Sequence, residues 1–362
     1  MITLHVDLGG EWRGGQHQAL ELVLGLRSRG HVAELVARKG SPLARRAAGK
    51  GIRVHSIGGF QPRLHAAITL RKLLGQARFE VVHSHDAHGL TAAWLAGGFR
   101  RTRQVASRRV AYPLLKNRLA LARYRRVHKI IAVSRFVKGS VLAAGLASDQ
   151  VEVIYDGVEL PRLPGGGERL QARERLPASG SGGCPLLGCV GYLLPEKGQE
   201  FLIRALPLVV GRYPKARLLL AGDGPCQRRL EHVARDLGVK ASVEFAGFVE
   251  DVAKVYQSLD LFIFPSLAEP LGSSLLSAMS HGLPVVAVAQ GAVPEVVEDG
   301  KNGLLVPDTD PDAIAAAILR LIDDAALSQR LGTAARRTIE QRFSVDRMVA
   351  ETIALYSRLC AD

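Results

Sequence analysis

The chain has 362 residues, 47% of them hydrophobic and 23% charged, a balance that excludes both a disordered chain and a small disulfide-stapled domain. Its formal net charge of +14 predicts an anionic partner, nucleic acid or anionic lipid, but 5% aromatic residues are too few for the stacking platforms that bind single-stranded nucleic acid. The four cysteines show no CxxC spacing, which argues against a zinc site and indicates a reducing cytoplasm. We expect no signal peptide, because a strand-like run starts at once, and no membrane span, because no apolar stretch approaches roughly 20 residues.

Strand-like apolar runs alternate with amphipathic helical stretches in the first part of the chain. The expected strands are residues 2–8, 32–37, 54–57, 81–84, 104–107, 130–133 and 151–154. The expected helices between the first of them are residues 16–29 and 42–50. This alternation predicts βαβ units and a parallel sheet.

A second series of the same kind follows a stretch rich in Gly, Pro and Ser, residues 161–184, which we interpret as a linker. Its expected strands are residues 186–190, 216–221, 243–246, 259–265 and 285–288. Its expected helices are residues 199–213, 227–237, 274–281 and 311–322. We therefore predict Rossmann-like domains over residues 1–160 and 185–345. A C-terminal helix, residues 346–362, is expected to pack back on the first domain. Open sheets of this kind bind ligands at the carboxyl ends of their strands, so a cleft between the domains is expected.

A glycine-rich turn lies between the first expected strand and the first expected helix. It runs from Asp7 to Gln16 and contains Gly14 and Gly15. Glycines there allow backbone N–H groups to approach a phosphate or a sugar at a helix N-terminus. The spacing is not that of the dinucleotide fingerprint GxGxxG, so a permissive turn is the alternative interpretation.

Two segments of the second domain place charged residues just after strand ends. Lys197 can direct its ammonium at a diphosphate, although a solvated surface lysine is the alternative. Glu269 follows another buried strand, and Gly272 and Ser273 then open a helix whose free N–H groups can hold a phosphate. Glu269 would face the sugar attached to that phosphate. The alternative is an acidic residue that only supports the helix N-terminus.

Residues 259–287 resemble the donor-site signature of the retaining glycosyltransferases of family 4, and the resemblance extends over nearly the whole chain. The other matching segments are residues 131–134, 153–158, 190–198, 220–225, 247–249, 290–295 and 299–306. The resemblance implies an α/β protein of the GT-B fold, with two Rossmann-like doubly wound domains facing a central cleft. The first domain is then on the acceptor side, and the second binds a nucleotide sugar.

The family resemblance also implies roles for single residues. Lys197 would neutralise the donor diphosphate, and Gly272 and Ser273 would bind it through backbone N–H groups. Glu269 would contact the transferred sugar, and the strand-end histidine His85, which we choose over His83, would touch the donor sugar and support the reacting geometry. A core or surface histidine is the alternative interpretation. The complete set of donor-binding residues so implied is Gly14, Gly15, Tyr192, Lys197, Val249, Leu271, Gly272, Ser273 and Ser277, with His85 and Glu269 as the catalytic residues.

The sequence departs from the family pattern at two positions. Tyr192 stands where the family often has an arginine, which removes a diphosphate charge, and Ser277 stands where it often has a second glutamate. A carboxylate there would hold the ribose hydroxyls in two hydrogen bonds, which one serine hydroxyl cannot match. The donor base therefore stays open. Two alternatives to a transferase stay open as well: a weak or silent nucleotide-sugar-binding protein, and an epimerase or phosphorylase of the same fold.

We expect neither a cofactor nor a metal ion, because Lys197 and a helix N-terminus can stabilise the leaving diphosphate and the carboxylates of the first domain form no paired DxD motif. The expected partners are a nucleotide sugar, a glycan or lipid-linked acceptor and an anionic membrane surface, not nucleic acid. Residues 100–129 hold eleven Lys or Arg and no Asp or Glu. The interleaved Leu114, Leu115, Leu119, Leu121 and Tyr124 predict an apolar side that lies on the lipid. We expect a cytoplasmic protein, peripheral on the inner face of the membrane.

Overall fold

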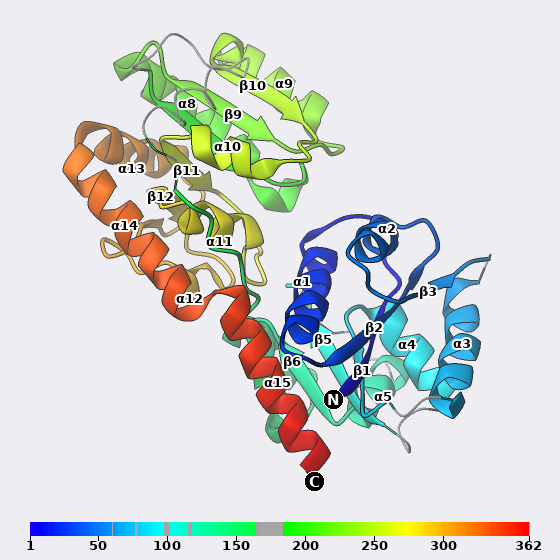
Figure 1. The fold of residues 1–362 in the computed structure, drawn as a ribbon. Coiled ribbons are helices and arrows are strands. Elements are labelled where there is room, and N and C mark those ends of the chain that lie inside the picture. The colour runs from blue at the N-terminus through cyan, green and yellow to red at the C-terminus, as the bar shows by residue number, and fades with distance from the viewer. Residues whose placement is uncertain are drawn as a thin grey trace. The chain divides into compact units, whose positions relative to one another are not determined.

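The chain folds into two compact units in the computed structural model, which describes residues 1–59, 61–76, 79–97, 102–114, 118–163, 165 and 184–361 (Figure 1). The first unit is Met1–Gly157 with Val345–Asp362, and the second is Val158–Ser344. Of the predicted linker, only residues 161–163, 165 and 184 are among those described. Both units are α/β domains built on a parallel sheet, which confirms the predicted fold class.

The first unit has a seven-stranded sheet in the order β3-β2-β1-β4-β5-β6-β7. Its strands are β1 (Ile2–Asp7), β2 (Val32–Arg38), β3 (Val54–Ile57), β4 (Val81–Ser84), β5 (Arg103–Arg108), β6 (Lys129–Ala132) and β7 (Val151–Val153). Its helices are α1 (Gly14–Ser28), α2 (Pro42–Gly49), α3 (Pro62–Gln76), α4 (Ala87–Ala96), α5 (Arg118–Arg126), α6 (Arg135–Ala143) and α15 (Val345–Ala361). The strand order reverses direction between β1 and β4, so the carboxyl ends of these two strands flank the point where such sheets bind ligands.

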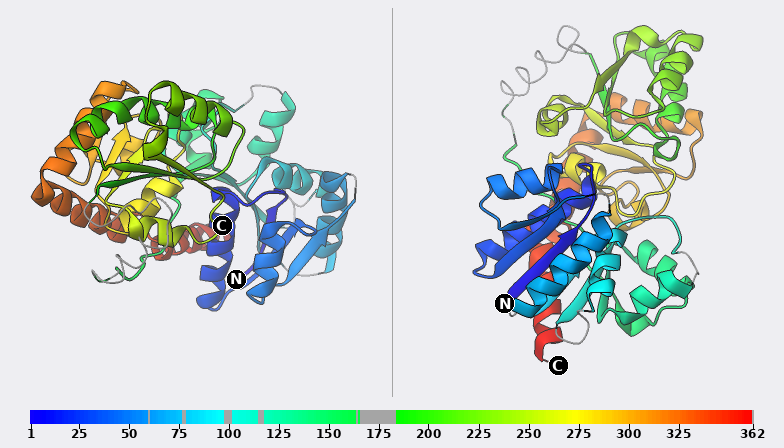
Figure 2. Two further views of the ribbon diagram at one scale, coloured as in Figure 1. Left: turned by 90° about the horizontal axis from the view of Figure 1, so that it is seen from above. Right: turned by 90° about the vertical axis from the view of Figure 1, so that its right-hand side faces the viewer.

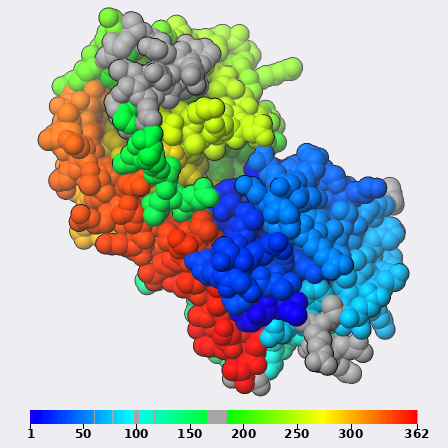
Figure 3. Space-filling model, viewed as in Figure 1, coloured from blue at the N-terminus to red at the C-terminus, as the bar shows by residue number. Residues whose placement is uncertain are grey.

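The first sheet is covered on both faces, because its strands are apolar on both sides (Figures 1 and 2). On β2, Leu35 belongs to the core that α1, α2 and α15 complete, whereas the next residue, Val36, belongs to the core with α3 and α4. The C-terminal helix α15 lies against residues from the start of the chain (Figure 3). A Cβ on Gly25 of α1 would stand 2.4 Å from a methyl carbon of Val349 on α15, so glycine permits this close approach.

The second unit has a six-stranded sheet in the order β10-β9-β8-β11-β12-β13. Its strands are β8 (Leu186–Val190), β9 (Arg217–Ala221), β10 (Val243–Gly247), β11 (Leu261–Phe264), β12 (Val285–Val288) and β13 (Leu304–Val306). Its helices are α8 (Gln199–Arg212), α9 (Gln227–Asp236), α10 (Val252–Ser258), α11 (Ser273–Ser280), α12 (Val293–Val296), α13 (Pro311–Asp323) and α14 (Ala325–Arg342). Here the order reverses between β8 and β11, which places the ends of those strands at the ligand-binding edge.

The basic segment at residues 100–129 differs from the prediction. Leu114, Leu121 and Tyr124 are each less than 9% exposed, so they pack into the first unit and cannot form an apolar side on a lipid surface. Leu115 and the side chain of Leu119 lie outside the described residues. Leu121 and Tyr124 lie three residues apart on α5, the spacing of a core-facing stripe, and this part of the prediction was wrong because a core face and a lipid face have the same sequence pattern.

Candidate functional site

Two loops of the second unit meet at the end of its sheet. One follows β8 and contains the short 3-10 helix Pro195–Lys197, and the other follows β11. The N–H of Leu267 donates to the carbonyl of Glu196 at 2.8 Å, which ties the loops together. Gly198 has φ of 68°, and a Cβ there would lie 2.0 Å from the carbonyl oxygen of Pro265. Only glycine therefore allows the two loops to approach so closely.

This approach brings Lys197 and Glu269 together. The Nζ of Lys197 donates to Oε2 of Glu269 at 2.7 Å, and the hydroxyl of Ser266 donates to the same oxygen at 3.0 Å. The Lys197 side chain is 28% exposed and the Glu269 side chain only 7%. A cation and an anion, hydrogen-bonded and partly shielded from water, thus stand at the ligand-binding edge of the sheet.

The backbone of Glu269 is fixed by the loop after β12. The N–H of Ala292 donates to the carbonyl of Glu269 at 3.0 Å. Gly291, with φ of 62°, approaches so closely that a Cβ on it would lie 2.4 Å from that carbonyl oxygen. Gly272, at φ of 98°, is the N-cap of α11, and no side chain caps that helix start. The unpaired N–H groups of the first turn of α11 therefore begin at Ser273, four residues after Glu269.

The other predicted donor-binding residues occupy neighbouring loops of the same unit. Tyr192 follows β8 and is 39% exposed, whereas Leu271 is buried. Val249 is half-buried in the loop between β10 and α10. Ser273 is exposed at the start of α11, and Ser277 faces the buried Tyr256, whose pKa is raised by burial. Among the described residues, none of these five side chains hydrogen-bonds to the side chain of Lys197 or Glu269, so their roles stay predictions.

In the first unit, the predicted glycines stand at the start of a helix. Gly14 and Gly15 are the first two residues of α1, and Arg13 before them provides no side-chain cap. Gln16 of the same turn donates to the carboxylate of Asp7 at 3.1 Å, at the end of β1. The turn therefore presents open backbone N–H groups beside the carboxyl end of β1.

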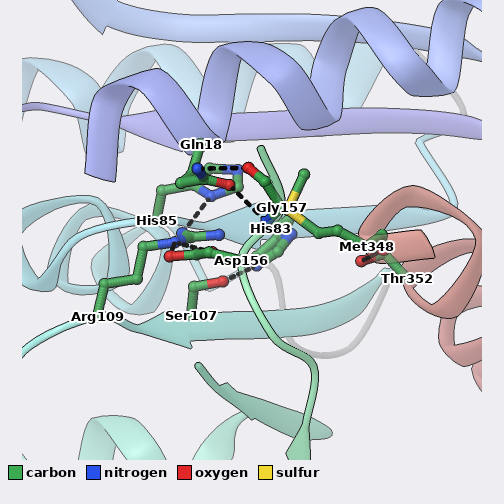
Figure 4. Close-up of polar contacts among 9 residues, drawn as sticks. All are labelled: Gln18, His83, His85, Ser107, Arg109, Asp156, Gly157, Met348 and Thr352. Atoms are coloured by element: carbon green, nitrogen blue, oxygen red, sulfur yellow. Dashed lines mark hydrogen bonds and ion pairs between the residues drawn. The ribbon is translucent and has the colours of Figure 1, made fainter. Parts of the chain in front are cut away.

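A cluster of three buried histidines, His5, His83 and the predicted His85, lies at the β1–β4 reversal point, and Figure 4 shows two of them, His83 and His85. His85 Nε2 contacts His5 Nδ1 at 2.9 Å, and His85 Nδ1 contacts Arg109 Nη1 at 3.1 Å. His83, paired with His5 in the sheet register, contacts Ser107 Oγ at 2.7 Å and the Tyr356 hydroxyl of α15 at 2.6 Å. The C-terminal helix thus contributes a side chain to this cluster.

Burial keeps the histidine cluster neutral. It lowers the pKa of His5 to about 3, with a further contribution from the Arg109 charge, and it lowers the pKa of His83 and His85 well below the ordinary value. One nitrogen of each ring lies within 4.8 Å of the others, a set that neutral imidazoles could offer to a metal ion. All six ring nitrogens, however, already contact polar groups of the protein.

Two family profiles match the chain. The profile described as Glycosyltransferase Family 4 matches residues 12–162, and the one described as Glycosyl transferases group 1 matches residues 184–324. A GDP-mannose-dependent alpha-(1-6)-phosphatidylinositol monomannoside mannosyltransferase of Mycolicibacterium smegmatis is 32% identical over 345 residues, which cover 90% of each chain. This chain belongs to glycosyltransferase family 4.

Other similar proteins agree with that family and fold. A lipopolysaccharide core biosynthesis glycosyltransferase of Rhizobium meliloti is 33% identical over 176 residues, 49% of this chain and 51% of its own. The crystal structure of Anabaena HepE, in complex with UDP and glucose, superposes with a TM-score of 0.87 over 99% of both chains at 23% identity. That structure supports the GT-B fold of this family 4 member.

Several side chains that complete the clusters of this glycosyltransferase were not predicted from the sequence. Ser266, whose hydroxyl donates to Glu269, lies within residues 259–287, but no role was predicted for it. His5 alternates with apolar residues along the first strand, and its register with His83 could not be known before the strand order was. Arg109 was counted among surface charges, yet its side chain is 9% exposed and its Nε donates to Asp156 at 2.8 Å. Its partner comes from 47 residues further along the chain.

A carboxylate pair beside the histidines predicts a pH dependence of stability. Asp86 caps α4 by accepting from the N–H of Gly89 at 2.7 Å. Burial, followed by the charge of Asp7, raises the pKa of Asp86 to about 7. Because this folded-state pKa lies above the unfolded one, the stabilising contribution is complete below about pH 4 and is lost as the pH rises through about 7. Asp86→Asn keeps the side-chain oxygen that caps α4 but cannot ionise. The melting temperature of this variant, relative to that of wild type, should therefore rise as the pH is raised from 5 to 8.

The matched control is Asp324→Asn at the exposed N-cap of α14, where the aspartate accepts from the N–H of Leu327. Each pKa unit corresponds to about 1.4 kcal/mol, so the change should be visible in thermal denaturation followed by circular dichroism. The difference between Asp324→Asn and wild type should stay constant over this range. Parallel melting curves for Asp86→Asn and wild type would contradict the assignment.

Proposed function

We propose that this protein is a retaining glycosyltransferase that moves a sugar from a nucleotide-diphosphate sugar to a hydroxyl of a lipid-linked or cell-envelope glycan. The observation that carries the proposal is the Lys197–Glu269 pair beside the uncapped start of α11, at the strand-order reversal of the second sheet. The M. smegmatis and R. meliloti relatives, named for a phosphatidylinositol mannoside and for lipopolysaccharide core, support this class of acceptor.

The proposed reaction assigns each of these groups a task. Lys197 and the first N–H groups of α11 stabilise the negative charge that develops on the leaving diphosphate. Glu269 contacts the transferred sugar and also holds the ammonium of Lys197 in place. The acceptor oxygen forms its bond to the anomeric carbon on the face that the diphosphate leaves, which retains configuration. The bonding electrons go to the nucleoside diphosphate, and the hydroxyl proton passes to the departing phosphate oxygen.

A two-stage experiment tests this function. Thermal-shift screening against UDP-, GDP- and ADP-sugars should give one class of donor that raises the melting temperature, because a ligand of the native state stabilises it by mass action. Incubation of that donor with membrane lipid extracts and envelope glycans should then give a glycosylated product by mass spectrometry. Binding without any product would identify a silent binding protein, and donor conversion without acceptor would identify an epimerase or a phosphorylase.

We predict that turnover needs no added metal ion. Lys197 and the start of α11 offer positive charge where a metal would otherwise neutralise the diphosphate. Excess EDTA should change kcat by less than about twofold, and elemental analysis of the purified protein should find far less than one metal ion per chain. The second measurement also tests the histidine cluster as a metal site. Activity restored only by manganese or magnesium would refute the prediction.

The acceptor class raises the question of how the protein reaches a membrane. Among the described residues, no helix combines the length and the apolarity that crossing a bilayer requires. We propose that the docking surface lies on α3, α4 and α5. Helix α4 contacts both α3 and α5, and the three helices contain no Asp or Glu. Leu64 and Ile68 of α3 are 50% and 48% exposed, one turn apart on the same helix face. Exposed apolar and basic side chains together favour an anionic lipid surface, on the cytoplasmic face.

Reversing the charge of this surface should weaken membrane binding. On α3, Arg63, Arg71 and Lys72 are exposed, and each basic residue near an anionic surface contributes on the order of 1 kcal/mol. Changing all three to Glu should reduce partitioning onto phosphatidylglycerol vesicles by more than about tenfold at low salt. Liposome co-sedimentation measures this partitioning.

The control carries the same change of charge on the second unit, at the exposed residues Lys215, Arg228 and Arg235. This control variant should bind the vesicles more strongly than the α3 variant does. Equal loss in both variants would mean that net charge alone drives binding. Equal pelleting of the wild type with anionic and neutral vesicles would contradict membrane docking altogether.

A further inference from the structure

Arg109 is the one cation that contacts the histidine cluster within the described residues, and it lies beside the glycine-rich start of α1. Its Cδ is 4.0 Å from the position of a Cβ on Gly15. Its Nε donates to both carboxylate oxygens of Asp156, at 2.8 and 3.1 Å. Gln18 of α1 exchanges two hydrogen bonds with the backbone of Gly157, at 2.8 and 3.1 Å, and so fixes the segment that carries Asp156 (Figure 4).

The direction of the hydrogen bonds in this cluster follows from Arg109. A guanidinium can only donate, so His85 accepts at Nδ1 and, being neutral, carries its proton on Nε2. His85 then donates to Nδ1 of His5, which carries its own proton on Nε2 and donates to the hydroxyl of Thr3 at 3.1 Å. The Thr3 hydroxyl donates onward to the carbonyl of Val32 at 3.2 Å. Every proton in the chain of contacts has one acceptor, so the network has a single direction.

Both ring nitrogens of His85 therefore already have hydrogen-bond partners within the protein, His5 and Arg109. Arg109, in contrast, has five N–H groups, of which Nε and one on Nη1 are used. Its Nη2 has no hydrogen-bond partner among the described residues and is not one of their fully buried unpaired atoms. Three N–H donors of a guanidinium fixed by Asp156 and His85 are thus left for a group outside the protein.

The surroundings of these donors favour an anion. The helix α1 begins at Gly14 and Gly15, beside Arg109. It has 15 residues, no side-chain cap and no acidic residue in its first turn, so the positive end of its dipole is open to an anion. A guanidinium fork matches the geometry of phosphate oxygens and binds them through two parallel hydrogen bonds. Asp156 faces Nε, so it orients the fork without occupying it.

We propose that Arg109 is the side chain of this cluster that contacts substrate, that it binds a phosphate group of that substrate, and that His85, His5 and Asp156 are positioning residues for it. The proposal rests on the proposed glycosyl transfer, whose substrates supply two sources of phosphate. One source is the diphosphate of the donor, and the other is a phosphate on the acceptor.

The test uses the double variant Arg109→Gln/Asp156→Asn, which removes the cation and its buried counter-charge together. Calorimetry with UDP, GDP and ADP, each compared with its nucleoside, measures the donor phosphate. Inorganic phosphate added to the protein saturated with the bound nucleotide measures the acceptor phosphate. The control is Arg29→Gln/Asp346→Asn, which removes an exposed pair of the same unit and should match wild type in every titration.

Loss of at least about tenfold in nucleoside diphosphate affinity, with nucleoside affinity unchanged, assigns Arg109 to the donor. Unchanged nucleotide affinity with loss of the inorganic phosphate response assigns it to the acceptor. A folded double variant with wild-type affinity for both probes would overturn the proposal. If wild type binds no nucleotide, the proposed donor class fails, but inorganic phosphate alone still tests Arg109.

The positioning role has its own pair of variants at His5. Asn places an oxygen acceptor near the position of Nδ1, whereas Leu fills similar space without an acceptor. His5→Leu should weaken the phosphate response in the direction of the Arg109 variant, and His5→Asn should restore it. Side-chain nitrogen NMR of His85 should show the proton on Nε2 in wild type and His5→Asn. Equal phosphate responses in the two His5 variants would overturn the positioning role.

Discussion

Lys197→Ala should reduce kcat/KM with the cognate donor by about a hundredfold or more, because it removes the side-chain cation beside the start of α11. The chain has Tyr192 where the family often has an arginine, so the diphosphate has fewer cations to rely on. The ammonium is 28% exposed, which leaves it accessible to a ligand while Glu269 holds it in place. Steady-state kinetics with the donor identified by thermal shift measures the effect.

Two further variants separate chemistry from stability. Lys197→Ala leaves the carboxylate of Glu269, which is 7% exposed, without its cation, so the melting temperature should fall. The double variant Lys197→Ala/Glu269→Gln removes both charges and should recover stability but not activity. Lys215→Ala, an exposed lysine of the same unit, should keep wild-type activity. A loss below about tenfold for Lys197→Ala, or about 1.4 kcal/mol, would refute its role at the diphosphate.

All seven strands of the first sheet and five of the six strands of the second were predictable, because parallel strands buried on both faces read as short apolar runs. Residues 186–190 and 285–288 were predicted with the bounds that β8 and β12 have. β13 and α14 were not predicted. β13 has only three residues, and the 18 residues of α14 mix buried Leu331 and Ile339 with many polar positions.

For the candidate site, the sequence predicted single residues but not the contacts between residues that lie far apart in the chain. Lys197 and Glu269 could be found because each follows its own strand and stands before a helix. Their contact could not be found, since it depends on β8 and β11 being neighbours in the sheet. The same holds for His5 and His85, which lie 80 residues apart. Sequence identifies residues at strand ends, whereas the strand order decides which of them meet.

Arg109 illustrates the opposite error. A run of basic residues without acids predicts a solvated or membrane-facing surface when each residue is considered with its neighbours in the chain. The structure instead buries Arg108 to 4% exposure and pairs Arg109 with Asp156. A buried arginine needs a counter-charge, and here that charge comes from a loop beyond two further strands. Local charge patterns therefore cannot separate surface arginines from paired ones.

Glu269→Gln should fold like wild type and lose about a hundredfold or more in kcat/KM. The amide keeps the shape of the side chain and still accepts from Ser266, and the contact of Ala292 with the backbone carbonyl is unaffected. What disappears is the negative charge 2.7 Å from Lys197. The ion pair is partly exposed, so its loss should cost on the order of 1 kcal/mol and lower the melting temperature by only a few degrees.

Glu196→Gln is the matched control for this change. Its side chain is exposed one residue before Lys197, and the substitution removes the same charge from the same loop. Glu196 contributes its backbone carbonyl, not its side chain, to the hydrogen bond with Leu267 that joins the loops. The control should therefore keep activity within about twofold of wild type. A Glu269→Gln variant that is clearly destabilised yet fully active would show that Glu269 only stabilises the N-terminus of α11. A loss of activity equal in both variants would indicate general electrostatics of the loop rather than contact with the sugar.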